Sequence, residues 1–317
     1  MWLLDKPWRQ LVFVSVLQIS FGVEQTNPSP PAADECGVVA AADGHQSQHP
    51  KQWPFHVGLY RIVAGSGDSL YFCGATIVSR WFVVGSAHCV LNYAPEMLSV
   101  RYATYDLTQP EQGGKVGVSR VLLHPEYRAQ NFSHDIALLE LSSGLTFDET
   151  TVRPACLWPT VPGETVSVGD QLEGTVGTSV GWGIGPHNLY TYVLLILEVS
   201  ASTKRKCIES FDERLFTGDQ FFCAVTPVCK GSGGSGFYVK VGDRYYLRGI
   251  TTFGIAAKGK YQCGVNTLTS LLNVAHYTDW IQQQLADHHS HSQLPEPEMP
   301  EQQTEQAMVQ QQQQQPQ

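Results

Sequence analysis

Three stretches of the sequence carry side chains that are able to perform nucleophilic catalysis. The stretch V-C-K-G-S-G-G-S-G-F-Y-V holds Ser232 and Ser235 in a glycine-rich run. Such a run suits a nucleophile presented at a turn, or a backbone that approaches a ligand closely. His88 stands beside a cysteine, and Asp135 precedes a mostly apolar stretch. A histidine and a buried aspartate are the types that serve as general base and as the group that orients it.

The same residues also have a purely structural explanation. A histidine beside a cysteine is usually structural in an exported protein, because the cysteine is fixed in a disulfide. An imidazole hydrogen-bonded to a buried carboxylate satisfies both groups inside a fold. The presence of His88 and Asp135 therefore does not by itself establish catalysis.

Short β-type segments separated by turn residues occupy the chain from about Trp53 to Ser270. They include Phe55–Tyr60, Trp81–Val84, Val116–Leu123, Ile136–Leu141, Tyr192–Val199 and Tyr245–Thr252. Many short strands with glycine- and proline-rich connections predict an all-β sandwich or barrel. Apolar residues at approximately helical spacing predict a C-terminal helix over Leu271–Ala286.

The two ends of the chain differ in composition from this centre. Residues 1–22 combine two basic residues with a short apolar run, which predicts a secretory signal peptide and is too short for a membrane span. Residues 23–52 are polar and turn-rich, with Cys36 to tie them down. Residues 287–317 are rich in Gln, Pro and Glu, and we expect them to be disordered because they have few apolar side chains to bury.

Charge and cysteine content narrow the class of protein. A formal net charge of −9 without a Lys/Arg cluster argues against a nucleic-acid partner. Eight cysteines in an exported chain predict four disulfides, and the lack of any C-x-x-C pair disfavours a zinc site. The histidines near residue 290 are expected in a solvated linker, so we expect no metal and no cofactor. In an extracellular chain, Asn131-Phe-Ser is an N-glycosylation acceptor on an exposed loop.

Taken in chain order, these stretches resemble the chymotrypsin-like (trypsin-type) serine proteases. The order His, Asp, then glycine-rich serine loop is the family's order. Further matches lie between Cys36 and Trp280, namely Trp53-Pro-Phe, Arg153-Pro-Ala-Cys-Leu, Gly181-Trp-Gly and Tyr277-Thr-Asp-Trp-Ile. The resemblance implies two antiparallel six-stranded β-barrels, at 53–157 and 158–286, with a site in the cleft between them and a C-terminal helix.

The resemblance also implies how the cysteines pair. The implied disulfides are Cys36–Cys156, Cys73–Cys89, Cys207–Cys223 and Cys229–Cys263. All eight cysteines are then used. A further pair common in active members, joining positions near Gly177 and Val239, is missing at both ends together.

The nucleophile motif departs from the family pattern Gly-Asp-Ser-Gly-Gly-Pro. Aligned without a gap from Cys229, the nucleophile position is Gly233 and the preceding Asp becomes Ser232. This form resembles the G-D-G-G-S-P variant of non-catalytic serine protease homologues, several of them from insects. It leaves no side chain to attack a carbonyl. A one-residue deletion instead makes Ser232 the nucleophile; the alignment without a gap is favoured.

Two further departures concern activation and specificity. In active members, cleavage after Lys or Arg frees an Ile-Val-Gly-Gly amine that pairs with the motif's Asp. The corresponding segment here is Ala42–His45, which has no preceding Lys or Arg and does not begin with an apolar pair. An oxyanion hole that is not shaped in this way forfeits about 3–4 kcal/mol of transition-state stabilisation for each missing donor. Pro227 stands where trypsin-type members carry an acidic residue. The substrate strand Ser-Trp-Gly appears as Thr252, Phe253 and Gly254, of which Phe253 still offers an aromatic face to a peptide.

These departures predict a secreted, catalytically inactive homologue that acts as a cofactor, decoy or regulator. Its expected partner is a protein, namely a protease, a zymogen or another component of an extracellular cascade, and resemblance to insect homologues suggests innate immunity. We expect neither a nucleic-acid nor a membrane partner. The enzyme alternative is a weakly active serine endopeptidase using Ser232 (or Ser235) with His88 and Asp135. A third class, a purely structural secreted protein, predicts no saturable partner.

Overall fold

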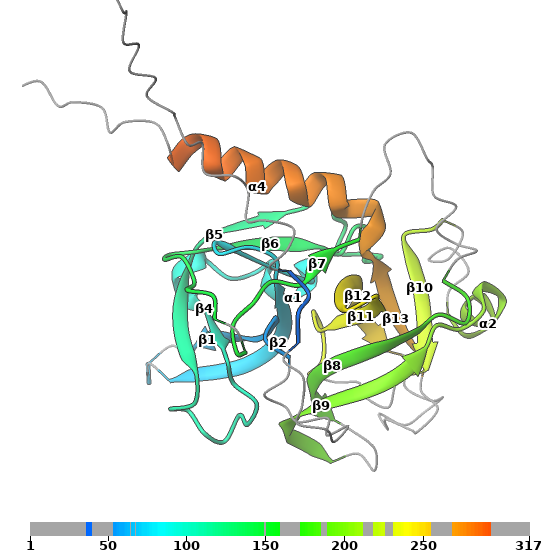
Figure 1. The fold of residues 1–317 in the computed structure, drawn as a ribbon, viewed down its shortest axis with the longest axis horizontal. Coiled ribbons are helices and arrows are strands. Elements are labelled where there is room, and N and C mark those ends of the chain that lie inside the picture. Colours follow the sequence, from blue (N-terminus) through cyan, green and yellow to red (C-terminus); the bar gives the residue numbers. More distant parts are fainter. Residues whose placement is uncertain are drawn as a thin grey trace, which may run out of the picture.

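β-Strands dominate the computed structural model of this chain. The structure describes residues 36–39, 53–63, 65–66, 68–148, 150–158, 172–184, 189–211, 218–225, 231–254 and 268–292. Figure 1 shows two groups of strands side by side, with one long helix lying across the first group. The all-β class predicted from the short β-type segments is confirmed.

The first group of strands is a closed antiparallel barrel. Around the barrel the order is β1 (His56–Ile62), β2 (Ser69–Ile77), β3 (Phe82–Gly85), β6 (Ala137–Leu141), β5 (Gly114–Leu123) and β4 (Leu98–Tyr102). Alternate side chains of each strand point inward. The resulting core includes Val57, Leu59, Ala75, Ile77, Val83, Val100, Leu139 and Leu141. Burial of each large aliphatic side chain stabilises the fold by roughly 1.5–3 kcal/mol.

The second group is a sheet that curls toward closure. Its strands run in the order β10 (Phe221–Val225), β13 (Leu268–Asn273), β12 (Arg244–Gly254), β11 (Gly236–Val241), β8 (Val176–Ile184) and β9 (Tyr190–Ser200). A bridge between Ala201 and Ala224 links the end of β9 to β10 at the opposite edge. A short strand, β7 (Cys156–Leu157), pairs in parallel with β12.

Aromatic side chains fill the space between the two groups of strands. Trp182 on β8 and Tyr238 on β11 are fully buried. The Tyr238 ring lies 4.8 Å from that of Phe55 and 5.5 Å from that of Trp53, counted between centroids. The Tyr238 hydroxyl also forms a hydrogen bond of 2.7 Å with Thr76 Oγ1 on β2. These large, rigid rings, together with the hydrogen-bonded Tyr238 hydroxyl, hold the two groups of strands in a fixed arrangement.

Helices are few among the described residues. They are α1 (Ala87–Val90), α2 (Lys204–Ser210), α4 (Thr278–Ser292) and two 3₁₀ turns (Pro95–Met97 and Val274–Tyr277). Thr203 caps α2 by accepting a hydrogen bond from the Lys206 backbone N–H. Helix α4 lies along the first barrel near β5 and β6 (Figure 1), where His288 reaches Glu140 of β6 at 3.4 Å.

Two predicted boundaries near the C-terminus were wrong. The helix predicted over Leu271–Ala286 begins only at Thr278, because Leu271–Asn273 complete β13 between β10 and β12. The helix continues past Ala286 to Ser292, so the first six residues of the tail predicted at 287–317 are helical. The rest of that segment lies outside the described residues.

One boundary between the barrels also needs correction. Cys156 and Leu157, which the predicted boundary places in the first barrel, pair with Tyr246 and Leu247 of the second sheet. The six segments predicted as β-strands all contain strands, with ends that differ by at most two residues.

Three of the four implied disulfides are present. They join Cys36 to Cys156, Cys73 to Cys89 and Cys207 to Cys223. The fourth, Cys229–Cys263, lies outside the described residues, as do residues 1–22 and Ala42–His45. Within the described part of the chain, no helix is both long and apolar enough to cross a membrane.

Candidate functional site

Pairing between β3 and β6 brings a histidine and an aspartate together. Helix α1 follows β3 and carries His88, and Asp135 lies just before β6. His88 Nδ1 lies 2.7 Å from Asp135 Oδ2, and the His88 backbone N–H donates to Asp135 Oδ1 at 2.8 Å. The Asp135 side chain is fully buried, whereas 27% of the His88 side chain is exposed. The carboxylate therefore fixes the orientation of the imidazole, as in a general-base pair.

Gly233 lies directly opposite this imidazole. A Cβ built on Gly233 would sit 3.0 Å from His88 Nε2 and 3.4 Å from the sulfurs of Cys73 and Cys89. The loop is held to both sheets, because the Gly74 N–H donates to Gly233 O and the Gly234 N–H donates to Thr251 O, each at 2.8 Å. This geometry supports the alignment in which Gly233 takes the nucleophile's place.

The two serines of the loop are buried and are not exposed to a substrate. Ser235 is 1% exposed, and its Oγ has no hydrogen-bond partner among the described residues. A Cβ on Gly74 or on Gly181 would overlap with Ser235 Oγ, so these glycines make room for the Ser235 side chain. Ser232 is 4% exposed, with its Cβ on the β8 side near Gly181.

A tyrosine from the first barrel holds the start of the glycine loop. The Tyr71 hydroxyl donates to the Gly231 carbonyl at 2.8 Å, and its ring packs edge-on against Trp182 at 5.4 Å. Burial raises the pKa of the Tyr71 phenol well above its ordinary value, so the hydroxyl remains a donor at neutral pH. No sequence pattern indicates this hydrogen bond, because Tyr71 and Gly231 are 160 residues apart.

Aromatic rings line the site beside His88. The Phe253 ring lies 5.2 Å from Phe132, 5.7 Å from Phe211 and 6.4 Å from Phe221. Phe132 is also 5.8 Å from the His88 ring. The residues come from four separate segments, so only Phe253 was identified from the sequence. A cluster of this kind offers an apolar surface to a bound peptide side chain.

The neighbours of Phe253 on β12 differ in exposure. Thr252 is buried and donates a long hydrogen bond to Ile250 O, whereas Gly254 is exposed. Pro227, the residue predicted for the base of the specificity pocket, lies outside the described residues. Asn131 is exposed and accepts a hydrogen bond from the Ser133 N–H, next to Phe132.

Within the part of the chain that the structure describes, two groups of three side chains have metal-ligating atoms within 4.8 Å of one another. In the group Cys73, His88 and Cys89, the sulfurs are joined in a disulfide and are not available as thiolate ligands. The other group consists of His124, Glu126 and His134. It offers imidazole nitrogens and a carboxylate oxygen, and none of these atoms belongs to a disulfide.

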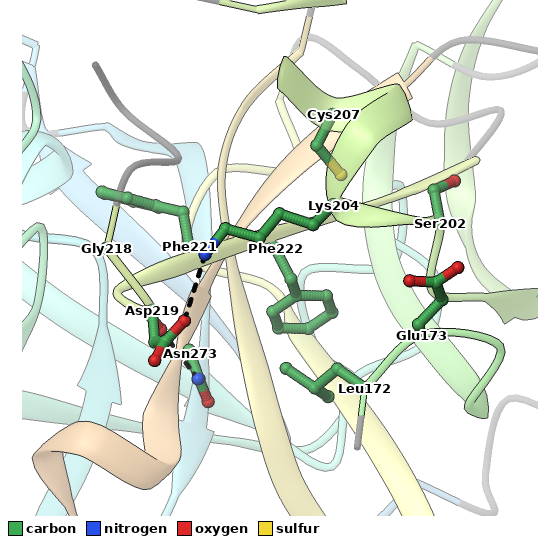
Figure 2. Close-up of a pocket in the computed structure, with 10 residues that line it drawn as sticks. All are labelled: Leu172, Glu173, Ser202, Lys204, Cys207, Gly218, Asp219, Phe221, Phe222 and Asn273. Atoms are coloured by element: carbon green, nitrogen blue, oxygen red, sulfur yellow. Dashed lines mark hydrogen bonds and ion pairs between the residues drawn. The ribbon is translucent and has the colours of Figure 1, made fainter. Parts of the chain in front are cut away.

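A separate pocket lies in the second sheet, away from His88 and Gly233. Figure 2 shows Phe222 and Leu172 in its interior and Lys204 extended toward Asp219, at 3.4 Å between Nζ and Oδ1. Both charged side chains are more than 40% exposed, so the ion pair adds little stability. The pocket is lined by Leu172, Glu173, Ser202, Lys204, Cys207, Gly218, Asp219, Phe221, Phe222 and Asn273.

Comparison with known proteins identifies the family to which the chain belongs. A family model described as Trypsin matches residues 42–281. The chain is 27% identical over 240 residues to serine protease grass of Drosophila melanogaster, covering 69% of this chain and 62% of that protein. It is 27% identical over 269 residues to serine proteinase stubble of the same organism, covering 79% of this chain and 32% of that protein. The chain thus spans less than two thirds of either relative. Since the family model covers most of the described strands and the whole candidate site, the chain belongs to the trypsin family.

Proposed function

We propose that this chain is a catalytically inactive member of its family that binds a protein partner without cutting it. The position of Gly233 carries the proposal. A side chain at this position would point toward His88 Nε2, and glycine has no side chain that can attack a carbonyl. Ser232 and Ser235 lie in the same loop but are 4% and 1% exposed, which disfavours either as a substitute nucleophile.

The intact His88–Asp135 pair is compatible with inactivity. Asp135 is fully buried and accepts two hydrogen bonds from His88, so the pair satisfies polar groups that folding has removed from water. A structural contribution of this kind is independent of any nucleophile. We infer that stability, rather than proton transfer, is what the pair supplies here.

The aromatic cluster supports a protein as the ligand. Phe132 and Phe253 are each half-buried, next to the partly exposed His88, so an apolar side chain of a bound segment would pack against both rings. The resemblance assigns Pro227, which lies outside the described residues, to the pocket base, where a basic side chain would then find no counter-charge.

The proposed setting is an extracellular proteolytic cascade. Three disulfides and the signal-peptide character of residues 1–22 favour export, with a glycan on Asn131. The similar Drosophila proteins are named as serine proteases. We propose that the partner is a protease, a zymogen or another component of such a cascade, and that innate immunity is its physiological context.

The experiment is a saturable capture of partners from native extracellular fluid by the purified chain and by two variants. Phe253→Ala removes an aromatic ring from the candidate cleft, and Val241→Ala trims an exposed side chain at the far end of β11 as the matched control. The proposal predicts a partner that the wild type and Val241→Ala retain, that Phe253→Ala retains at least about tenfold less well, and that is recovered uncut.

Three other results would contradict the proposal in different ways. If the wild type, Phe253→Ala and Val241→Ala retain a partner equally well, that partner binds outside the cleft. The absence of any saturable partner favours the purely structural alternative. Cleavage of the partner, lost in Ser232→Ala, favours the weakly active serine endopeptidase that uses Ser232 with His88 and Asp135.

A further inference from the structure

Two histidines from neighbouring strands lie face to face beside the site. His124 follows the last residue of β5, and His134 lies three residues before β6. Because β5 pairs with β6, and because the His124 N–H donates to Ile136 O at 3.1 Å, the two rings are stacked. Their centroids are 4.9 Å apart and their planes differ by 5°.

A carboxylate completes this group. Glu126 lies two residues after His124, and its Oε2 is 3.8 Å from His134 Nε2. One donor atom from each of His124, Glu126 and His134 lies within 4.8 Å of the others. Ligands around tetrahedral Zn²⁺ stand about 2.0–2.2 Å from the ion, so neighbouring ligand atoms are about 3.3–3.5 Å apart. The observed spacing is slightly wider, and Glu126, with 68% of its side chain exposed, is free to close it.

The surroundings of His134 orient it as a ligand. Its Nδ1 lies 3.2 Å from the Tyr277 hydroxyl, and Nε2 faces Glu126 Oε2 and, at 3.1 Å, the Gln220 amide. A metal-bound histidine characteristically donates its second N–H to an oxygen, which fixes the ring and its tautomer. Tyr277 supplies that oxygen. Rotation of the Gln220 amide turns its carbonyl oxygen toward the same point, as a fourth ligand.

The backbone at His134 is unusual. Its φ is +53°, in the left-handed region of backbone conformation that residues other than glycine seldom adopt. Such a conformation is strained and persists where the surroundings enforce it, often at functional sites. In this conformation the His134 ring stacks on that of His124.

We propose that His124, Glu126 and His134 form a binding site for a transition-metal dication of the Zn²⁺ class. Two imidazoles and one carboxylate are a donor set suited to zinc, whereas Ca²⁺ and Mg²⁺ prefer all-oxygen sites. The sequence predicted no metal, because only the cysteines and the histidines near residue 290 stood out there as candidate ligands. This site shares no residue with the proposed partner cleft, so either proposal can fail without the other.

The experiment is calorimetric titration of Zn²⁺ into the full-length chain after removal of metals with EDTA. His124→Asn and Glu126→Gln each remove one ligand, and Glu126 is exposed enough for its variant to fold normally. The control is the double variant His289→Asn/His291→Asn, which removes two histidines of the other candidate metal-binding segment. Titrations with Mg²⁺ and Ca²⁺ test the selectivity.

The expected result is one Zn²⁺ bound per chain, with affinity at least about tenfold weaker in His124→Asn and in Glu126→Gln and unchanged in the control. Mg²⁺ and Ca²⁺ should not compete at equal concentration. The proposal is wrong if the wild type binds no Zn²⁺, if both ligand variants retain the wild-type affinity, or if only the control loses it.

Discussion

Around His88, the imidazole and Asp135 satisfy each other's polar atoms, whereas behind the glycine loop Ser235 and His56 bury polar atoms without partners among the described residues. His56 lies on β1 with its Cε1 3.0 Å from the position of a Cβ on Gly74, a position that would also overlap with Ser235 Oγ. The two sides of one candidate site thus differ in polar satisfaction as well as in chemistry.

The difference indicates that the need to keep hydrogen-bond partners is strictest at the buried Asp135 carboxylate. A buried carboxylate has to keep its donors, because an unpaired buried charge is costly. A glycine in place of a nucleophile leaves no buried charge unpaired, so it does not lower the stability of the fold by a comparable amount. The proposed absence of a reacting side chain at Gly233 would therefore leave the His88–Asp135 side of the site unchanged, and that side alone is not evidence of catalysis.

The largest expected effect concerns His56 and pH. Burial lowers the pKa of His56 from its ordinary 6.5 to about 3. Between pH 6.5 and 3 the unfolded chain therefore takes up a proton that the folded chain does not, so stability falls as the pH is lowered through this window. From pH 7 to pH 4, His56 should account for a loss of about 3 kcal/mol.

Denaturant unfolding of the wild type and of His56→Phe at pH 7 and pH 4 measures this contribution. The variant should lose about 3 kcal/mol less than the wild type over the same pH change. His289→Asn, which alters an exposed histidine, serves as the control. Equal losses in all three chains would show that the His56 ring is hydrogen-bonded and readily protonated in the fold.

The next effect concerns the satisfied half of the site. Asp135→Ala removes the acceptor of both His88 hydrogen bonds, and we expect the free energy of unfolding at pH 7 to fall by about 2–3 kcal/mol. The exposed Asp68→Ala should change it by less than about 0.5 kcal/mol. If the two variants were equally stable, the pair would have no structural role and its retention would need a functional reason.

The smallest effect has the opposite sign. Ser235→Ala removes a buried hydroxyl that has no partner among the described residues, and the free energy of unfolding should rise by about 1 kcal/mol. Ser143→Ala, on an exposed bend, should leave it unchanged. A decrease in Ser235→Ala would mean that this hydroxyl forms a stabilising hydrogen bond, which would remove the contrast between the two halves.

Much of the fold was accessible from the sequence, because its determinants are local. Short β-type segments and turn signals located the strands, and the ordered family motifs implied three disulfides that the structure contains. The start of the C-terminal helix was misplaced because a short buried segment such as Leu271–Asn273, with its two leucines, fits a strand as well as a helix.

The site was only partly accessible, because its remaining parts are brought together by tertiary packing. His88, Asp135 and Gly233 belong to motifs with a recognisable spacing. Tyr71, which reaches Gly231 from β2, and Phe132, which meets Phe253 from a separate loop, have no signal within their own segments.

The most direct test of the central claim is labelling with a fluorophosphonate probe, which reacts with activated serines. We expect no labelling of the wild-type chain at a probe concentration that fully labels active trypsin, since Gly233 leaves the position opposite His88 Nε2 without a hydroxyl. Labelling of the wild type that disappears in both Ser232→Ala and His88→Ala would contradict the proposed inactivity and identify Ser232 as a working nucleophile.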